Sequence, residues 1–303
     1  MEHLIISEIM HQGDRGAIVP IECIADLHKD IENLRDSNYF TQTTGNIIRD
    51  FYHFDLPMVE FPIRSVIIVA SPTPIVRIHF NWRNQRIPVL KPPITKGIAD
   101  RISDYLNTLL HPAGFHAVHT YGLPLKMLSV RAGLSEYGRN NITYVQDLGS
   151  LINLEFFYTD LPCTEYIWRE LARMKFCDTC NACIANCPTN AIQVDRPVIE
   201  VEKCLTYLNE FIDLCDFPGW LEPSSHNCIH GCLKCQISCP KNHEVVKHIM
   251  EAVEFTERET KILLEGATLD RLAEPLKSKL EQIDLMDYLH LLPRNLRVLL
   301  DQV

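Results

Sequence analysis

Cys177-Asp-Thr-Cys-Asn-Ala-Cys-Ile-Ala-Asn-Cys-Pro188 is the stretch of this 303-residue chain that says most about its fold, together with Cys232-Leu-Lys-Cys-Gln-Ile-Ser-Cys-Pro240. The first stretch has the C-x2-C-x2-C-x3-C-P spacing of bacterial-type 4Fe–4S proteins. Three cysteines at intervals of three can wrap one face of a cuboidal cluster, while the fourth points away and ligates another cluster. The proline then turns the chain outward because it lacks an amide proton. The two stretches predict two 4Fe–4S clusters.

A zinc ribbon is the alternative interpretation, since two Cys-x2-Cys pairs are enough to bind zinc. A four-cysteine run followed by a second run that ends in Cys-Pro favours iron–sulfur binding instead. Most of the 12 cysteines lie between residues 177 and 239, and such clustering indicates metal binding rather than disulfides. Outside this region, Cys23 and Cys163 lie in apolar surroundings and are expected to be buried, inert thiols.

The crossed-ligand rule divides the expected ligands into two sets. One cluster is expected to use Cys177, Cys180, Cys183 and Cys239. The other is expected to use Cys187, Cys232 and Cys235 with one further cysteine, and the candidates are Cys204, Cys215 and Cys228. Cys204 would begin a helix, where a thiolate is favoured, whereas Cys228 would give a C-x3-C-x2-C loop. Spacing alone does not choose between these candidates.

The composition is that of a globular protein, with 46% hydrophobic and 22% charged residues. The net charge of −10 makes a nucleic-acid partner unlikely, because such partners usually require a basic face. The first residues show no basic leader, and no apolar run reaches about 18 residues, so we expect no membrane contact and a cytoplasmic location. Thiolate-bound clusters further indicate a reducing, anaerobic compartment.

Hydrophobic periodicity predicts an α+β, layered domain over residues 1–170. Helices are expected at residues 1–11, 24–34, 46–51, 94–110 and 124–132. Strands are expected at residues 19–21, 64–70, 115–120, 141–145 and 151–159, with a hairpin at 76–82 and 87–90. A ferredoxin-like module with two 4Fe–4S clusters should follow at 171–242, with a helix at 205–214. A short helical C-terminal segment should occupy 243–303, with an apolar stripe formed by Leu269, Leu272, Leu276, Leu280 and Ile283.

Three segments ahead of the cysteines resemble a known family: Leu123-Pro-Leu-Lys126, Arg131-Ala-Gly-Leu-Ser-Glu-Tyr-Gly-Arg-Asn-Asn141 and Thr159-Asp-Leu-Pro162. Their order is similar to that in the cobalamin-dependent iron–sulfur reductases, which include epoxyqueuosine reductase and, more distantly, the reductive dehalogenases. This resemblance implies a nitroreductase-like cobalamin domain followed by a module whose two clusters reduce the cobalamin.

The resemblance also implies roles for individual residues. It makes Cys204, which Tyr207-Leu208 follows, the eighth cluster ligand. It places the cofactor against Arg131, Gly133, Ser135, Gly138, Asn140 and Asn141. By likeness to the dehalogenases, Tyr121 becomes the candidate proton donor, with Lys126 as a basic neighbour that would lower the pKa of a phenol.

The chain also departs from the family pattern. The segment His119–Pro124 has no carboxylate where epoxyqueuosine reductase carries a catalytic aspartate. Ser135 replaces the second glycine of the family motif, and Arg139 replaces its lysine. The helical tail implicated in tRNA binding is reduced to about 60 residues.

The main hypothesis is an iron–sulfur oxidoreductase that passes single electrons to a cofactor, cobalamin, for reduction of an unknown small substrate. A second hypothesis is an electron-transfer or corrinoid-reactivating protein, whose N-terminal domain docks a partner or holds another cofactor such as a flavin. Reduction of epoxyqueuosine in tRNA comes third. All three require an external electron donor of the ferredoxin or flavodoxin type.

Overall fold

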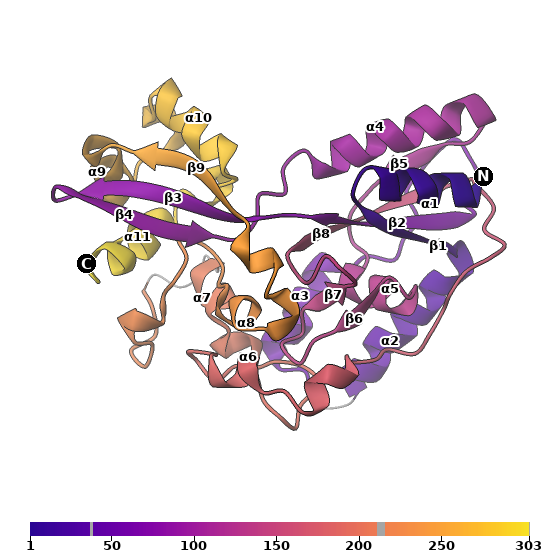
Figure 1. Cartoon of the computed structure of the whole chain (residues 1–303), viewed down its shortest axis with the longest axis horizontal. Helices are drawn as coiled ribbons and strands as arrows, with labels where there is room; N and C mark the ends of the chain where they lie inside the picture. Colours follow the sequence, from indigo (N-terminus) through magenta and orange to yellow (C-terminus); the bar gives the residue numbers. More distant parts are fainter. Residues whose placement is uncertain (37–38, 211–215, 303) are drawn as a thin grey trace. The chain divides into compact units, whose positions relative to one another are not determined.

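The computed structural model describes residues 1–36, 39–210 and 216–302 (Figure 1). The chain forms two compact units, and each is discontinuous in sequence. Unit 1 comprises Met1–Pro72, Lys96–Cys180 and Val194–Val198, and unit 2 comprises Thr73–Thr95, Asn181–Gln193 and Ile199–Val303. The predicted hairpin therefore belongs to the unit that holds the C-terminal residues. The functional division at residues 170 and 242 stays a prediction.

Unit 1 is built on a four-stranded antiparallel sheet in the order β1-β2-β8-β5. Its strands are β1 (Arg15–Pro20), β2 (Ser65–Pro72), β8 (Ile152–Thr159) and β5 (Ala117–His119). The central pair, β2 and β8, stays in register from Ser65↔Thr159 to Pro72↔Ile152. β2 is buried along nearly its whole length, as expected of an apolar strand covered on both faces.

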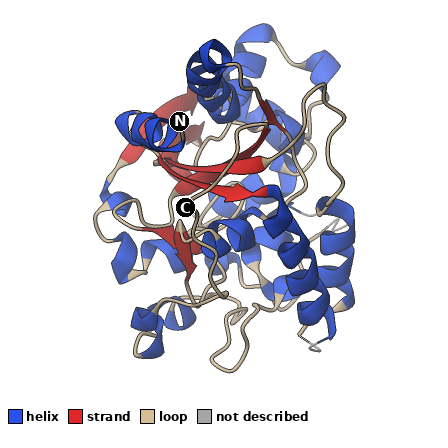
Figure 2. Cartoon of the chain, turned by 90° about the vertical axis from the view of Figure 1, so that its right-hand side faces the viewer, coloured by secondary structure: helices blue, strands red, loops and turns tan. Residues whose placement is uncertain are grey.

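Helices cover both faces of this sheet (Figure 2). Because side chains alternate along a strand, Ile67 and Val69 face α1 (Glu2–His11) and α4 (Ile98–Leu110). On the other face, Val66 and Ile68 pack with α2 (Ile24–Asp36), α3 (Gln42–Phe51) and α5 (Leu125–Arg131). The predicted mixed α+β fold is confirmed.

Two boundaries in unit 1 differ from the prediction. α3 begins at Gln42, four residues earlier than expected, because the Thr41 hydroxyl caps it by accepting a hydrogen bond from the Thr44 amide. α4 begins at Ile98 rather than Ile94, because Gly97 adopts a left-handed conformation with φ 80° ahead of it.

A small hairpin in unit 1 was predicted only in part: its second strand lies within the strand expected at 141–145, whereas its first strand was missed. It joins β6 (Ser135–Tyr137) and β7 (Thr143–Val145) in a two-stranded sheet. The first of these strands is only three residues long, too short to show a period of two. Asn141 lies in the turn with φ 59°, a left-handed conformation that asparagine tolerates better than most residues.

Unit 2 contains a three-stranded sheet in the order β4-β3-β9. β3 (Ile75–Trp82) and β4 (Gln85–Lys91) form the predicted hairpin, and positive φ angles at Arg83 and Asn84 fit a type I′ turn. β9 (Ile249–Phe255) runs parallel to β3. The purely helical prediction for residues 243–303 is wrong here, because Val253 and Phe255 alternate with exposed glutamates at the strand period.

The remaining elements of unit 2 are helices. Three of them are short and lie among the cysteines: α6 (Ala182–Ala185) contains Cys183, α8 (Lys234–Ile237) contains Cys235, and α7 (Leu205–Glu210) follows Cys204 directly. Three follow β9: α9 (Glu257–Glu265), α10 (Glu274–Gln282) and α11 (Leu292–Leu300). The predicted helix at 205–214 is observed as far as Glu210, and residues 211–214 lie outside the described residues.

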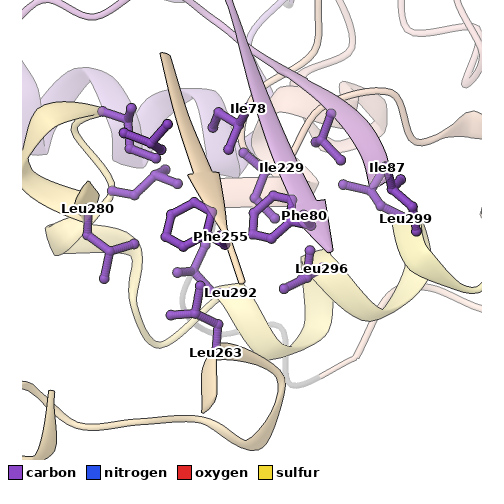
Figure 3. Packing of buried hydrophobic residues seen from close by; sticks show 14 of the residues in the cluster. Ile78, Phe80, Ile87, Ile229, Phe255, Leu263, Leu280, Leu292, Leu296 and Leu299 are labelled. Carbon is purple, nitrogen blue, oxygen red and sulfur yellow. The ribbon is translucent and has the colours of Figure 1, made fainter. Parts of the chain in front are cut away.

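The core of unit 2 lies between its sheet and the C-terminal helices (Figure 3). Phe80 of β3 and Phe255 of β9 stack with ring centroids 4.8 Å apart. Leu263, Leu280 and Leu296 contribute to the same cluster from α9, α10 and α11. The predicted apolar stripe is buried from Leu272 onward, whereas Leu269 is 54% exposed. Among the described residues, no helix is long and apolar enough to cross a membrane.

The stacked ring of Phe255 provides a test of this core. Phe255→Ala should lower the free energy of unfolding by about 3–5 kcal/mol, because it removes a fully buried aromatic ring and leaves a cavity. Met250→Ala on the same strand is the control, since Met250 is 38% exposed and should cost less than about 0.5 kcal/mol. Urea unfolding measures both variants, and equal losses would contradict the assignment of this core.

Candidate functional site

Three of the four cysteines expected at the second cluster, Cys187, Cys204 and Cys232, lie close enough within unit 2 to influence one another electrostatically. Burial, together with the nearby Cys204 and Cys187, raises the pKa of the Cys232 thiol to about 11, although the Lys234 amide and charge oppose the shift. Burial also raises the pKa of Cys204, while the backbone N–H groups of Thr206 and Tyr207 oppose this by donating to its sulfur. These amides belong to the first turn of α7, so Cys204 lies at a helix N-terminus, as the sequence predicted.

Cys228, the rival candidate, lies in a different environment. It is fully buried, and its backbone forms an isolated parallel β-bridge with Leu90 of β4. Burial raises the pKa of its thiol, and the nearby charged groups are Cys232, Lys91 and Lys234. Its sulfur also accepts a hydrogen bond from the backbone amide of Leu233, next to Cys232. Cys215, the third candidate, lies outside the described residues.

The cysteines expected at the first cluster are divided between the units. Cys177 and Cys180 belong to unit 1, where Cys177 is buried in the turn Lys175–Asp178. Cys183 and Cys239 belong to unit 2, where Cys183 lies in α6 and Cys239 directly precedes a proline-led turn. Within 1–36, 39–210 and 216–302, no three metal-binding side chains form a group compact enough for a single metal ion.

Arg131, expected to contact a cofactor, is occupied inside unit 1. Its Nε and Nη2 atoms donate to the two carboxylate oxygens of Asp30 at 2.9 and 2.6 Å. Its Nη1 atom donates to the Arg169 carbonyl at 3.1 Å. The hydrogen bond from Arg131 to Asp30 raises the pKa of this guanidinium, so it stays charged. Arg131 therefore joins α5 to α2 instead of offering its donors to a ligand.

Ser135 and Asn140 also point into the protein. The Ser135 hydroxyl lies 2.7 Å from that of Ser129, and both residues are buried. Asn140 donates to the Tyr144 hydroxyl at 3.0 Å and accepts from the Ile142 amide at 3.3 Å. A Cβ atom on Gly138 would approach Asn140 Oδ1 to 2.5 Å, so this glycine is required by packing within the hairpin.

The hairpin also holds the chain segment that carries Cys177. Arg139, which was not predicted to have a role of its own, donates to the Cys177 carbonyl and, at 3.3 Å, to the Val194 carbonyl. Asn141 donates to the Pro197 carbonyl at 3.0 Å. The backbone of Tyr137 accepts from the Met174 amide at 2.8 Å. We call Tyr137–Asn141 the cysteine-loop clamp.

In the described part of unit 1, three of the predicted cofactor residues line two separate cavities. Gly133 lines a hollow of about 690 Å³. Gly138 and Asn141 line another cavity, of about 200 Å³. The second cavity is smaller than the roughly 300–1,000 Å³ of typical small-ligand pockets. The residues expected around a corrin ring therefore do not fit that group as a set.

The predicted proton donor, Tyr121, is 82% exposed. Its ring contacts His119 edge-on, with centroids 4.8 Å apart. Lys126, the predicted neighbour, donates to the Asn141 carbonyl at 3.3 Å. Sequence reasoning missed Glu155, whose carboxylate lies 2.7 Å from His119 Nε2. The one available signal was a carboxylate inside the largely apolar strand β8.

The cysteine-rich part of the chain is similar to a known family. Residues 176–242 match the family described as 4Fe–4S double cluster binding domains, so this segment is similar to an iron–sulfur module. Curated proteins to which the chain is similar include several epoxyqueuosine reductases. The enzyme of that name from Cyclobacterium marinum is 32% identical over 162 residues, which cover 51% of this chain and 50% of the relative. The resemblance seen in the sequence is confirmed.

Solved structures agree at the level of fold. Epoxyqueuosine reductase from Bacillus subtilis matches with a TM-score of 0.65 and 16% identity over 98% of this chain and 80% of that chain. An epoxyqueuosine reductase with an epoxyqueuosine-modified stem loop of tyrosine tRNA matches with a TM-score of 0.65 and 16% identity, over 99% and 82%. In sequence, the chain spans about half the length of the curated relatives that it matches.

The cysteine-loop clamp can be tested through the stability of the first cluster. Arg139→Met removes the donors to Cys177 and Val194 and should speed loss of this cluster to a chelator about tenfold, equivalent to about 1.4 kcal/mol. Visible absorbance and iron release under anaerobic conditions follow the loss. Arg173→Met is the control, because the Arg173 side chain pairs with the exposed carboxylate of Asp178 and not with the backbone of the cysteine loop among the described residues. Equal rates in wild type and Arg139→Met would refute the clamp.

Proposed function

We propose that this chain is an iron–sulfur reductase of the epoxyqueuosine reductase type. It takes single electrons from a ferredoxin- or flavodoxin-like donor and passes them through two 4Fe–4S clusters to a substrate held by unit 1. The observation that carries this proposal is the double cluster match over residues 176–242 together with the mutual proximity of Cys187, Cys204 and Cys232.

In this proposal eight thiolates hold the clusters. One set is Cys177, Cys180, Cys183 and Cys239, and the other is Cys187, Cys204, Cys232 and Cys235. Cys204 is preferred over Cys228 because its neighbours include Cys187, and because the amides of α7 donate to its sulfur. Held by these thiolates, each cluster would accept and release one electron at a time.

Epoxyqueuosine in tRNA is the first substrate to test, ahead of an unknown small molecule. The curated relatives carry that activity in their names, and one solved structure contains an epoxyqueuosine-modified tRNA stem loop. The prediction that a nucleic-acid partner is unlikely is revised accordingly. It rested on a net charge of −10 for the whole chain, and a total charge does not describe one binding face.

No step of the proposed reaction is assigned to cobalamin. Arg131, Ser135 and Asn140, the side chains expected to hold it, bind inside unit 1. The same observation supports the second candidate function, an electron-transfer or corrinoid-reactivating protein that docks a partner. The two functions differ in whether the isolated protein turns over a substrate.

Iron content tests the ligand assignment. After anaerobic reconstitution, wild type should hold about eight irons, and Cys204→Ala about four, because one cluster loses a thiolate. Cys228→Ala, the matched control, should keep about eight, although its buried position can lower stability. If instead Cys228→Ala loses four irons and Cys204→Ala loses none, the eighth ligand is Cys228.

Turnover tests the proposed activity. Dithionite-reduced protein is incubated anaerobically with an epoxyqueuosine-containing tRNA stem loop, with and without added cobalamin, and the nucleoside is analysed by mass spectrometry. We expect a product that is one oxygen lighter. Electron paramagnetic resonance of the reduced clusters is the control for electron supply. Reducible clusters without product in either reaction would favour the electron-transfer function.

A further inference from the structure

We infer that His119 and Glu155 form an acid–base pair that delivers protons to an oxygen-bearing substrate whose C–O bond is cleaved reductively. This inference rests on the proposed function. It starts from strand register, because His119 ends β5 and lies opposite Phe157 of β8. Glu155 is two residues from Phe157 on the same strand, so it is the diagonal neighbour of His119 on the same face of the sheet.

The pair has a short contact in a sheltered position. His119 Nε2 lies 2.7 Å from Glu155 Oε2, and the two side chains are only 17% and 13% exposed. Glu155 Oε1 accepts a hydrogen bond from the Asn153 side chain at 2.6 Å. Both carboxylate oxygens are therefore engaged, and the carboxylate fixes the orientation of the imidazole. A hydrogen bond with an ionised partner of this kind is stronger than one between neutral groups.

The other ring nitrogen is available. Across the described part of the chain, His119 Nδ1 has no hydrogen-bond partner. This atom is also not fully buried. The ring packs against Phe157 at 5.3 Å and meets Tyr121 edge-on at 4.8 Å. A histidine with one nitrogen held by a carboxylate and the other open to solvent can accept and donate protons in a fixed direction.

Tyr121 marks the open side of the pair. It is 82% exposed, and the next residue, Gly122, accepts a backbone hydrogen bond from His53 at 2.9 Å. A Cβ atom on Gly122 would approach His53 to 3.1 Å, so the chain passes close to His53 at this point. An exposed tyrosine beside the imidazole offers a flat surface on which a planar substrate group can stack.

A second histidine–carboxylate pair on unit 1 serves as a comparison. His116 lies 3.1 Å from Asp160, but its side chain is 53% exposed and stacks on Phe61. Asp160 also accepts from the His116 backbone amide, so it serves to tie the loop that leads into β5. His119 differs in its shorter contact and its shelter from solvent.

The chemistry balances with two electrons and two protons. Reduction of an epoxide to an alkene breaks two C–O bonds, takes two electrons from the clusters and releases the oxygen as water. His119, as imidazolium, gives its Nδ1 proton to the oxygen as the first C–O bond breaks. After taking a second proton from solvent, it protonates the hydroxyl group that leaves as water. Glu155 acts as a positioning residue that stabilises the imidazolium between these transfers.

Single-turnover rates with the epoxyqueuosine stem loop test the assignment in the cluster-loaded protein. His119→Gln should slow product formation at least about 100-fold, and Glu155→Gln about tenfold, because general acid catalysis commonly contributes 10²–10⁴-fold. The matched control His116→Gln should retain the wild-type rate, and all three variants should keep wild-type cluster spectra. A wild-type rate in His119→Gln, or a comparable loss confined to Tyr121→Phe, would overturn the assignment to His119.

A readout independent of turnover separates this inference from the proposed function. In protein labelled with ¹⁵N-histidine, the ring N–H of His119 should give a nuclear magnetic resonance signal protected from exchange with water. The signal should disappear in His119→Gln and in Glu155→Gln and persist in His116→Gln. Its presence without turnover by wild type would refute the proposed substrate and support the pair. A His119 ring proton that exchanges as fast as that of His116 would refute the pair itself.

Discussion

The pairing of β2 with β8 is the constraint on which unit 1 depends. These two strands pair antiparallel along their full lengths, and each of their faces is covered by a separate helical cluster. Because the side-chain period of a strand is two, a shift of one residue would exchange the two faces. A shift of β8 would carry Glu155 and Phe157 together to the opposite face, away from His119. The packing of apolar residues on both faces thus fixes the place of a polar pair at the edge of the sheet.

Unit 2 is organised by a more local constraint. The cysteines that we assign to the second cluster lie on short helices and their ends, where little apolar surface is available for packing. The unit instead places its large core between the hairpin, β9 and the C-terminal helices. Cys228 and Ile229 join the two regions, because Cys228 bridges to Leu90 and Ile229 belongs to the core. The rigid core can therefore support a cysteine-rich segment that has few apolar contacts of its own.

The features that the sequence predicted are those with a local signal. Helical periodicity gave α1, α2 and α5, and an apolar run gave β2, since both patterns are read within one element. The position of Cys204 at the start of a helix was also legible from neighbouring residues. β9 was missed because its pairing with β3 joins residues far apart in the chain. The His119–Glu155 pair spans 36 positions and the Arg131–Asp30 pair spans 101, so neither leaves a trace in local spacing.

The segment from Arg131 to Asn141 shows that a sequence motif can predict where a turn lies without predicting the function of its residues. Its glycines, arginines and asparagines are the residue types that let a backbone approach a flat ligand, and they are also those that stabilise a tight hairpin. In this fold Gly138 makes room for Asn140, and Arg139 reaches the carbonyl of a cysteine that we assign to the first cluster. Support of that cysteine loop is sufficient to explain the motif. A chain can thus keep the sequence pattern of a cofactor-binding reductase because its iron–sulfur half requires it, while the groups that we infer to transfer protons lie on the separate four-stranded sheet.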